Sequence, residues 1–126
     1  MTFEQYKEKK FEKIISSMVD YMNMENEDGE DFGDCGYTQN EIDECAKILD
    51  DYIDELIALD SNSNEDAIMD SVKKVVLALN ELNERADYTL IETDQREYLC
   101  PFIQDAATNA GLPLTPVDIT EEWRMW

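Results

Sequence analysis

The feature that most constrains this chain is a helical pattern of apolar residues that follows Thr38. Between residues 42 and 56, apolar side chains recur at intervals of three and four positions, the spacing of one face of an α-helix. Thr38 and Glu41 precede this pattern with the spacing of a capping box, in which each side chain satisfies a free backbone N–H group. The apolar face comprises Ile42, Cys45, Ala46, Leu49, Tyr52, Ile53 and Leu56. Such a helix needs other elements to cover its apolar face.

Three further segments have the same periodicity. A first helix is predicted from Thr2 to about Met24. Another is predicted to follow the turn signal SNSN at residues 61–64 and to continue to about Ala86. Thr93 is expected to cap the last of the three. Amphipathic helices joined by short loops favour an antiparallel bundle, with orthogonal packing of the helices left open.

The last of these helices contains one residue that disturbs a helix and is followed by one that ends it, and a shorter segment comes after. Pro101 lies inside the helix and predicts a kink or a split, because proline removes one backbone hydrogen bond. Gly111 is suited to end it. The last nine residues, which include Thr120 as a cap, predict a further short helix. The predicted fold class is therefore all-α: a single acidic domain over residues 1–126, built as a bundle of about four amphipathic helices plus a short C-terminal helix.

Charge is distributed very unevenly along the chain, whose formal net charge is −21. Residues 1–24 hold four acids and four lysines, residues 25–72 hold seventeen acids against Lys47 alone, and residues 73–126 hold ten acids and five bases. A protein this acidic is repelled by nucleic-acid phosphates and by anionic membranes, so direct binding to either is not expected. Basic protein partners are favoured. Charge added only for solubility would be spread more evenly over the surface.

The acids of the middle segment are the candidate binding site. Twelve of them are candidates: six lie in a glycine-containing stretch expected to be a loop, and six project from the outer side of the helix after Thr38. Like charges four residues apart oppose that helix by about 0.2–0.5 kcal/mol per pair. The predicted partner contacts are Glu25, Glu27, Asp28, Glu30, Asp31, Asp34, Asp43, Glu44, Asp50, Asp51, Asp54 and Glu55. Their interpretation as a merely solvated surface stays open.

The residue types of the chain do not favour a catalytic site or a metal site. The chain has no histidine, which removes the commonest general base and the usual nucleophile–histidine pairs, so no catalytic residue and no cofactor are predicted. No stretch has the glycine and closing glutamate of a calcium loop, and no cysteine spacing suits zinc, so no metal site is predicted. Weak binding of divalent ions by residues 25–34 stays open.

Cysteine number and hydropathy bear on the compartment. Cys35, Cys45 and Cys100 are odd in number and widely spaced, which argues against a disulfide framework and fits a reducing environment. No apolar run has the length of a membrane span, and the N-terminal residues lack the apolar core of a signal peptide. We therefore expect a cytoplasmic protein.

Two smaller features carry expectations of their own. Four lysines interleave with acids on the first predicted helix, and we expect them to pair with these acids and to face the acidic middle of the chain. They are Lys7, Lys9, Lys10 and Lys13. A membrane or nucleic-acid role for this cluster is the alternative. Trp123 and Trp126 end the chain, and we expect this tail to fold back onto the core. The alternative is an aromatic anchor for a partner or for a second copy in a homodimer.

Two stretches, LIETDQREYLC (Leu90–Cys100) and DITEEWRMW (Asp118–Trp126), resemble parts of small acidic bacterial proteins. The overall type, a short acidic helical chain, is similar to immunity proteins of bacterial toxin systems. The resemblance implies a non-catalytic inhibitor that neutralises a basic partner such as a toxin nuclease. Two alternatives stay open: a nucleic-acid mimic that inhibits a DNA-binding protein, and a structural or dimerising module with a solvated acidic surface.

Overall fold

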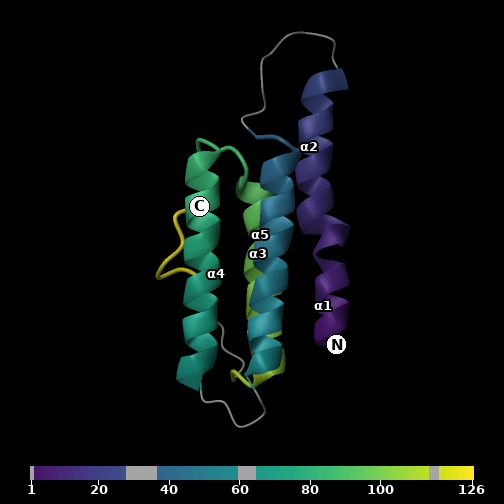
Figure 1. Cartoon of the computed structure of the whole chain (residues 1–126). Helices are drawn as coiled ribbons and strands as arrows, with labels where there is room; N and C mark the ends of the chain where they lie inside the picture. Colours follow the sequence, from purple (N-terminus) through teal and green to yellow (C-terminus); the bar gives the residue numbers. More distant parts are fainter. Residues whose placement is uncertain (1, 28–36, 60–64, 114–116) are drawn as a thin grey trace.

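A computed structural model describes residues 2–27, 37–59, 65–113 and 117–126, with residues 23–27 as backbone alone. The elements are α1 (Phe3–Lys9), the π-helical turn η1 (Phe11–Ile15), α2 (Ser16–Glu27), α3 (Gln39–Ala58), α4 (Glu65–Arg85) and α5 (Thr93–Ala110), with no strand among the described residues. Figure 1 shows α1, η1 and α2 as one rod, with α3, α4 and α5 following in alternating directions beside it. This arrangement confirms the predicted all-α bundle.

Local capping explains where the helices begin. The predicted capping box after residue 37 is confirmed, because Thr38 N donates to Glu41 Oε2 (3.2 Å). The side-chain hydroxyl group of Thr38 also donates to Glu41 Oε2 (2.5 Å), and this hydrogen bond lowers the pKa of the Glu41 carboxyl group. The prediction of Thr93 as a cap is wrong by one position, because Glu92 is the N-cap and its N–H donates to Gln95 Oε1 (3.0 Å). A glutamine three residues after Glu92 completes that box, and Thr93 has no such partner.

Pro101 does not split α5, so this part of the prediction is wrong. The helix continues from Thr93 to Ala110 around the proline. Leu99 and Ile103 flank Pro101 and are fully buried, so packing against the core holds the helix together despite the missing hydrogen bond. The helix ends at Gly111, as predicted, in the positive-φ conformation (φ 125°) that glycine adopts most readily.

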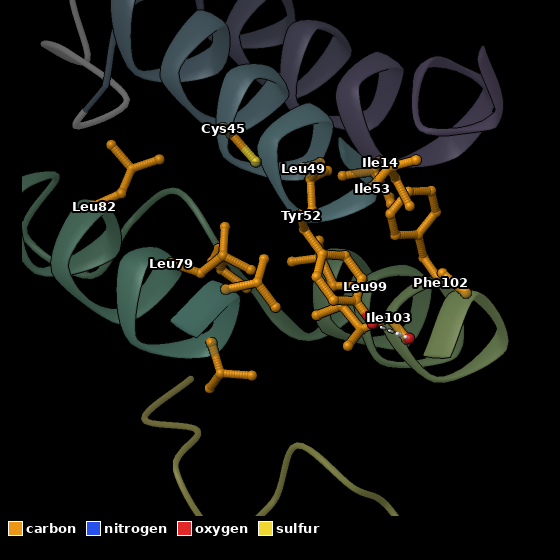
Figure 2. Close-up of a cluster of buried hydrophobic side chains, with 14 of the residues drawn as sticks. Ile14, Cys45, Leu49, Tyr52, Ile53, Leu79, Leu82, Leu99, Phe102 and Ile103 are labelled. Carbon is orange, nitrogen blue, oxygen red and sulfur yellow. Dashed lines mark hydrogen bonds between the residues drawn. The ribbon is translucent and has the colours of Figure 1, made fainter. Parts of the chain in front are cut away.

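The hydrophobic core surrounds α3, which contacts the first rod (α1, η1 and α2), α4 and α5 (Figure 2). Tyr52 is 1% exposed, and its hydroxyl group donates to the backbone oxygen of Ile103 across the core (2.8 Å). Burial of one large apolar side chain contributes about 1.5–3 kcal/mol to the stability of the folded state. The fully buried side chains around Tyr52 include Met18, Leu49, Ile53, Leu79 and Leu99. The predicted apolar face of α3 is therefore the centre of the fold.

The first rod departs from α-helical geometry at η1. There, Ile15 N donates to Lys10 O (3.0 Å), a bond that spans five residues where an α-helix spans four. The extra residue in this turn changes which side chains face the core. Lys10 becomes 2% exposed, and its Nζ lies 4.0 Å from the centre of the Phe11 ring. The sequence pattern, which continues through this turn at α-helical spacing, did not predict the irregularity.

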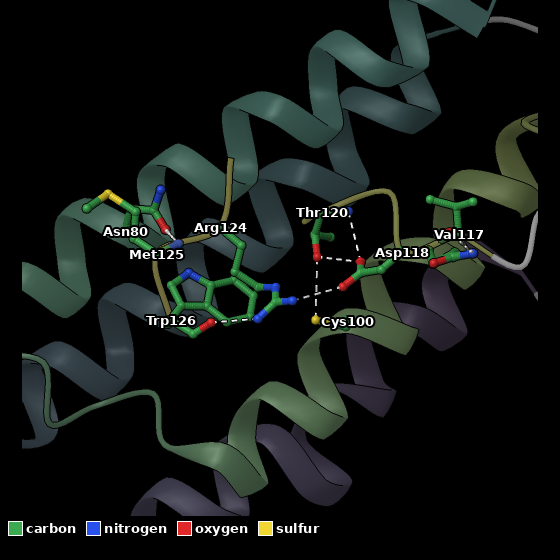
Figure 3. Close-up of polar contacts among 9 residues, drawn as sticks. Asn80, Cys100, Val117, Asp118, Thr120, Arg124, Met125 and Trp126 are labelled. Atoms are coloured by element: carbon green, nitrogen blue, oxygen red, sulfur yellow. Dashed lines mark hydrogen bonds and ion pairs between the residues drawn. The ribbon is translucent and has the colours of Figure 1, made fainter. Parts of the chain in front are cut away.

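The C-terminal tail folds back across α4 and α5, as expected (Figure 3). The side-chain amide of Asn80 holds the tail through two hydrogen bonds. Its Nδ2 donates to Trp123 O (2.7 Å), and its Oδ1 accepts from Met125 N (3.0 Å). Trp123 and Trp126 are partly buried against the core. The short final helix amounts to one turn, closed by the bond from Arg124 N to the oxygen of residue 120 (3.0 Å).

The tail should respond to acid through Asp118. Its carboxylate accepts hydrogen bonds from Thr120 N (2.9 Å) and Thr120 Oγ1 (2.6 Å) and pairs with Arg124 (3.2 Å). Burial alone would raise the pKa of Asp118, but these contacts hold it below its usual value. The stabilisation is therefore complete above the unfolded pKa of about 4 and is lost as pH falls through the lower folded pKa. Because Trp123 and Trp126 are the two tryptophans of the chain, tryptophan fluorescence should report this release.

Asp118→Asn provides the matched control for that titration. It keeps the shape of the side chain but removes the charge, so its fluorescence should already be shifted at neutral pH and should lack the acid step. An acid step of unchanged size in Asp118→Asn would assign the transition to other carboxyl groups.

Candidate functional site

The outer acids of α3 do not form one free face, because bases of neighbouring helices pair with most of them. On the side toward the first rod, Lys10 Nζ lies 2.6 Å from Asp50 Oδ1, and Lys7 Nζ lies 2.5 Å from Asp54 Oδ1. Lys10 Nζ also donates to the backbone oxygen of Lys7 (2.5 Å). The expectation that the lysines face the acidic middle of the chain is confirmed for Lys7 and Lys10.

On the opposite side of α3, α4 supplies the bases. Arg85 Nη2 lies 2.9 Å from Glu44 Oε2, and Lys74 Nζ lies 2.7 Å from Glu55 Oε1. The hydrogen bond to Glu55 raises the pKa of Lys74. These pairs link α3 to α4 at both ends of their contact. The predicted contacts Glu44 and Glu55 are therefore already engaged within the chain.

The two remaining outer acids of α3 are less engaged. Asp51 Oδ2 lies 3.7 Å from Lys47 Nζ, and both side chains are mostly exposed (62% and 79%). Such exposed pairs contribute at most about 1 kcal/mol. Asp43 accepts a hydrogen bond from Gln39 Nε2 (2.9 Å), and no base in the described part of the chain pairs with it. Along α3, these two carboxylates are the most available to a partner.

Half of the predicted contacts fall where the structure describes no side chains. Glu25 and Glu27 belong to the end of α2, of which the backbone alone is described. The other acids of this group, Asp28, Glu30, Asp31 and Asp34, lie outside the described residues. Their role in partner binding stays a prediction.

At one end of the bundle, α3 begins, α4 ends and α5 begins (Figure 1). The sequence of these three segments carries a second group of carboxylates. We call it the acidic end: Glu41, Asp43, Glu44, Glu84, Asp87, Glu92 and Asp94. The Arg85–Glu44 pair joins two of the three elements directly. In the last turn of α4 and the first turn of α5, the bases are Arg85 and Arg96. The acidic end therefore keeps a strong excess of negative charge.

Four acids of this end were not predicted as partner contacts, because they lie outside the acidic middle of the sequence: Glu84, Asp87, Glu92 and Asp94. They are exposed and pair with no base among the described residues. A usable signal was the run of acids around the connection between two predicted helices. Asp87 projects there from a turn with φ 56°, a backbone conformation more accessible to Asp and Asn than to most residues.

The two cysteines in the described part of the chain are at least partly buried. Cys45 is fully buried, and burial raises the pKa of its thiol to about 12. Burial also raises the pKa of Cys100, whose Sγ lies 3.5 Å from Thr120 Oγ1. Among the described residues, no three acids or cysteines are grouped to hold a metal ion. No helix described in the structure is long and apolar enough to cross a membrane.

The fold and the site together define a class: a small all-α bundle with an acidic end. Comparisons with protein-family models, curated proteins and solved structures find no match to this chain.

Proposed function

We propose that this chain is a non-catalytic binding protein of the toxin-immunity type, which neutralises a basic protein partner through its acidic end. The observation that carries the proposal is the gathering of seven carboxylates from α3, the end of α4 and the start of α5 beside Arg85 and Arg96. The chain would inhibit its partner by covering the partner's functional site, which requires no chemical reaction. Partner contacts by the acids of residues 25–34 stay a prediction from the sequence.

The distribution of ion pairs supports the acidic end over the outer face of α3. All ten bases of the chain lie in the described part, and the bases that pair with α3 are Lys7, Lys10, Lys47, Lys74 and Arg85. Paired carboxylates attract a partner less, and exposed unpaired ones attract it over about 8–10 Å at ordinary salt. The same pairing argues against a nucleic-acid mimic, because α3 does not carry a row of free charges at phosphate-like spacing.

The function can be tested by capturing proteins from a lysate of the source organism at low and high salt. We expect one dominant basic protein, identified by mass spectrometry, whose capture falls as salt rises. Its association rate with wild-type chain is then measured by surface plasmon resonance. Absence of any salt-sensitive basic partner would contradict the proposal.

A charge-matched pair of variants then locates the contact. The acidic-end variant E84Q/D87N/D94N should slow association with the captured protein about tenfold at low salt, because charge complementarity acts mainly on the association rate. The control variant D66N/D70N/E121Q removes the same charge from exposed acids elsewhere and should change the rate less than about twofold. Equal slowing by both variants would mean that net charge, and not the acidic end, attracts the partner.

A further inference from the structure

A groove of about 300 Å³ separates the first rod from α5, on a different part of the molecule from the acidic end. Three aromatic residues line it: Tyr6, Tyr98 and Phe102. The rings of Tyr6 and Phe102 pack edge to face, with their centres 6.0 Å apart and their planes at 87°. The groove therefore has a rigid aromatic floor of the kind that favours binding of another surface.

Both helices that border the groove are irregular where they line it. The first rod forms η1 there, and Lys13 and Ile14 of this π turn belong to the lining. π turns are frequent at functional sites. On the other border, Pro101 lines the groove and has no N–H group, so the oxygen of Glu97 lacks its usual helical donor. The groove therefore lies between two backbone irregularities.

The two walls of the groove carry opposite charge. Lys9 and Lys13 lie on the wall from the first rod, with Glu12 between them in sequence, and Glu97 and Asp105 lie on the wall from α5. Across the groove, neither lysine forms an ion pair with either of these acids. The opposite charges therefore border the aromatic floor on its two sides without pairing across it.

This pattern is self-complementary under a two-fold rotation about an axis along the groove. The rotation places the basic wall of each copy against the acidic wall of the other. Lys13 lies at the level of Glu97, because Lys13 Nζ lies 5.6 Å from the centre of the Tyr98 ring, next to Glu97 in sequence. Along the helix axes, Lys9 lies about 6 Å from Lys13 and Asp105 lies about 12 Å from Glu97. Lys13 of each copy would then face Glu97 of the other, and the long side chain of Lys9 would extend along the groove toward Asp105.

The groove also lies on the part of the chain that permits close approach of two copies. Residues 1–24 hold four acids and four lysines, whereas the whole chain carries −21. Repulsion between copies is therefore weakest at the first rod. We propose that a second copy of this chain docks at the groove, forming a symmetric dimer through the Lys9–Lys13 wall and the Glu97–Asp105 wall. Trp123 and Trp126, which pack against their own core, are not needed for it.

Sedimentation velocity with two charge-reversed variants tests the proposal. The wild-type chain should sediment as a concentration-dependent dimer. K9E/K13E makes both walls acidic and E97K/D105K makes both basic, so each alone should dimerise at least tenfold more weakly than the wild type. An equimolar mixture restores two acid–base contacts and should form a heterodimer about as well as the wild type forms its dimer. Circular dichroism of each variant checks that the helices are intact.

The mixture separates docking from a loss of structure, because two misfolded variants would not recover dimerisation together. The control K47E/K73E makes the same change of net charge away from the groove and should leave the dimer within about twofold of wild type. A wild-type chain that stays monomeric at every concentration would overturn the proposal, as would a mixture that associates no better than its separate components.

Discussion

Replacing Tyr52 with alanine is expected to lower the free energy of unfolding by about 3–5 kcal/mol, the usual cost of removing a buried aromatic ring. The side chain is 1% exposed and joins α3 to α5 through its hydrogen bond to Ile103 O (2.8 Å; Figure 2). Tyr52→Phe keeps the ring and removes the hydroxyl group, so it should cost about 1–2 kcal/mol. The difference between the two variants measures ring packing separately from the hydrogen bond.

Urea unfolding followed by circular dichroism gives both values from the shift of the midpoint. Tyr88→Ala is the control, because Tyr88 is 52% exposed and its removal should change the free energy of unfolding by less than about 0.5 kcal/mol. If Tyr52→Phe proved as damaging as Tyr52→Ala, the hydroxyl group rather than the ring would hold α3 against α5.

Asp50→Ala is expected to cost about 2–3 kcal/mol, because it leaves the ammonium group of Lys10 buried without its carboxylate. The side chain of Lys10 is 3% exposed, and that of Asp50 is 40% exposed. The solvent exposure of Asp50 keeps the cost below the full value for a buried pair. Lys10→Met should be close to neutral, within about 1 kcal/mol, because methionine fills the same space without a charge to desolvate.

The neighbouring pair of Lys7 and Asp54 is the matched control. The side chains of Lys7 and Asp54 are 28% and 57% exposed, so Asp54→Ala should cost less than about 1 kcal/mol. Thermal and urea unfolding of Asp50→Ala, Asp54→Ala and Lys10→Met on one day and in one buffer would rank them. A loss in Lys10→Met as large as that in Asp50→Ala would show that the ion pair itself stabilises the fold.

Local signals predicted the helices well. The capping box at Thr38 and Glu41 depends on backbone groups within one turn, and the termination at Gly111 depends on the conformation of one residue. Both are therefore visible in the sequence. Thr93 was predicted as the N-cap because threonine is commoner than glutamate at this position. Glu92 is the N-cap instead, because Gln95, three residues later, accepts a hydrogen bond from its backbone N–H.

The candidate site was less predictable, because a carboxylate's availability depends on which bases lie beside it in space. The sequence showed Lys47 as the single base near the acids of α3, but Lys10 and Arg85 reach the same acids from other helices. The acids around Asp87 looked minor in the sequence, yet the pair of Arg85 and Glu44 joins the end of α4 to the start of α3. Which carboxylates are free to bind a partner is therefore set by the tertiary structure.

By itself, the sequence determined the helical class, the apolar faces and most helix ends, since these follow from residue spacing and from hydrogen bonds within a turn. The tertiary structure decided that Pro101 could stay inside a helix, that η1 would form and that Lys10 would be buried beside Asp50. It also decided which acids remain unpaired. These outcomes depend on packing and ion pairs between residues far apart in the chain, whose energies exceed the local preferences that a sequence reveals.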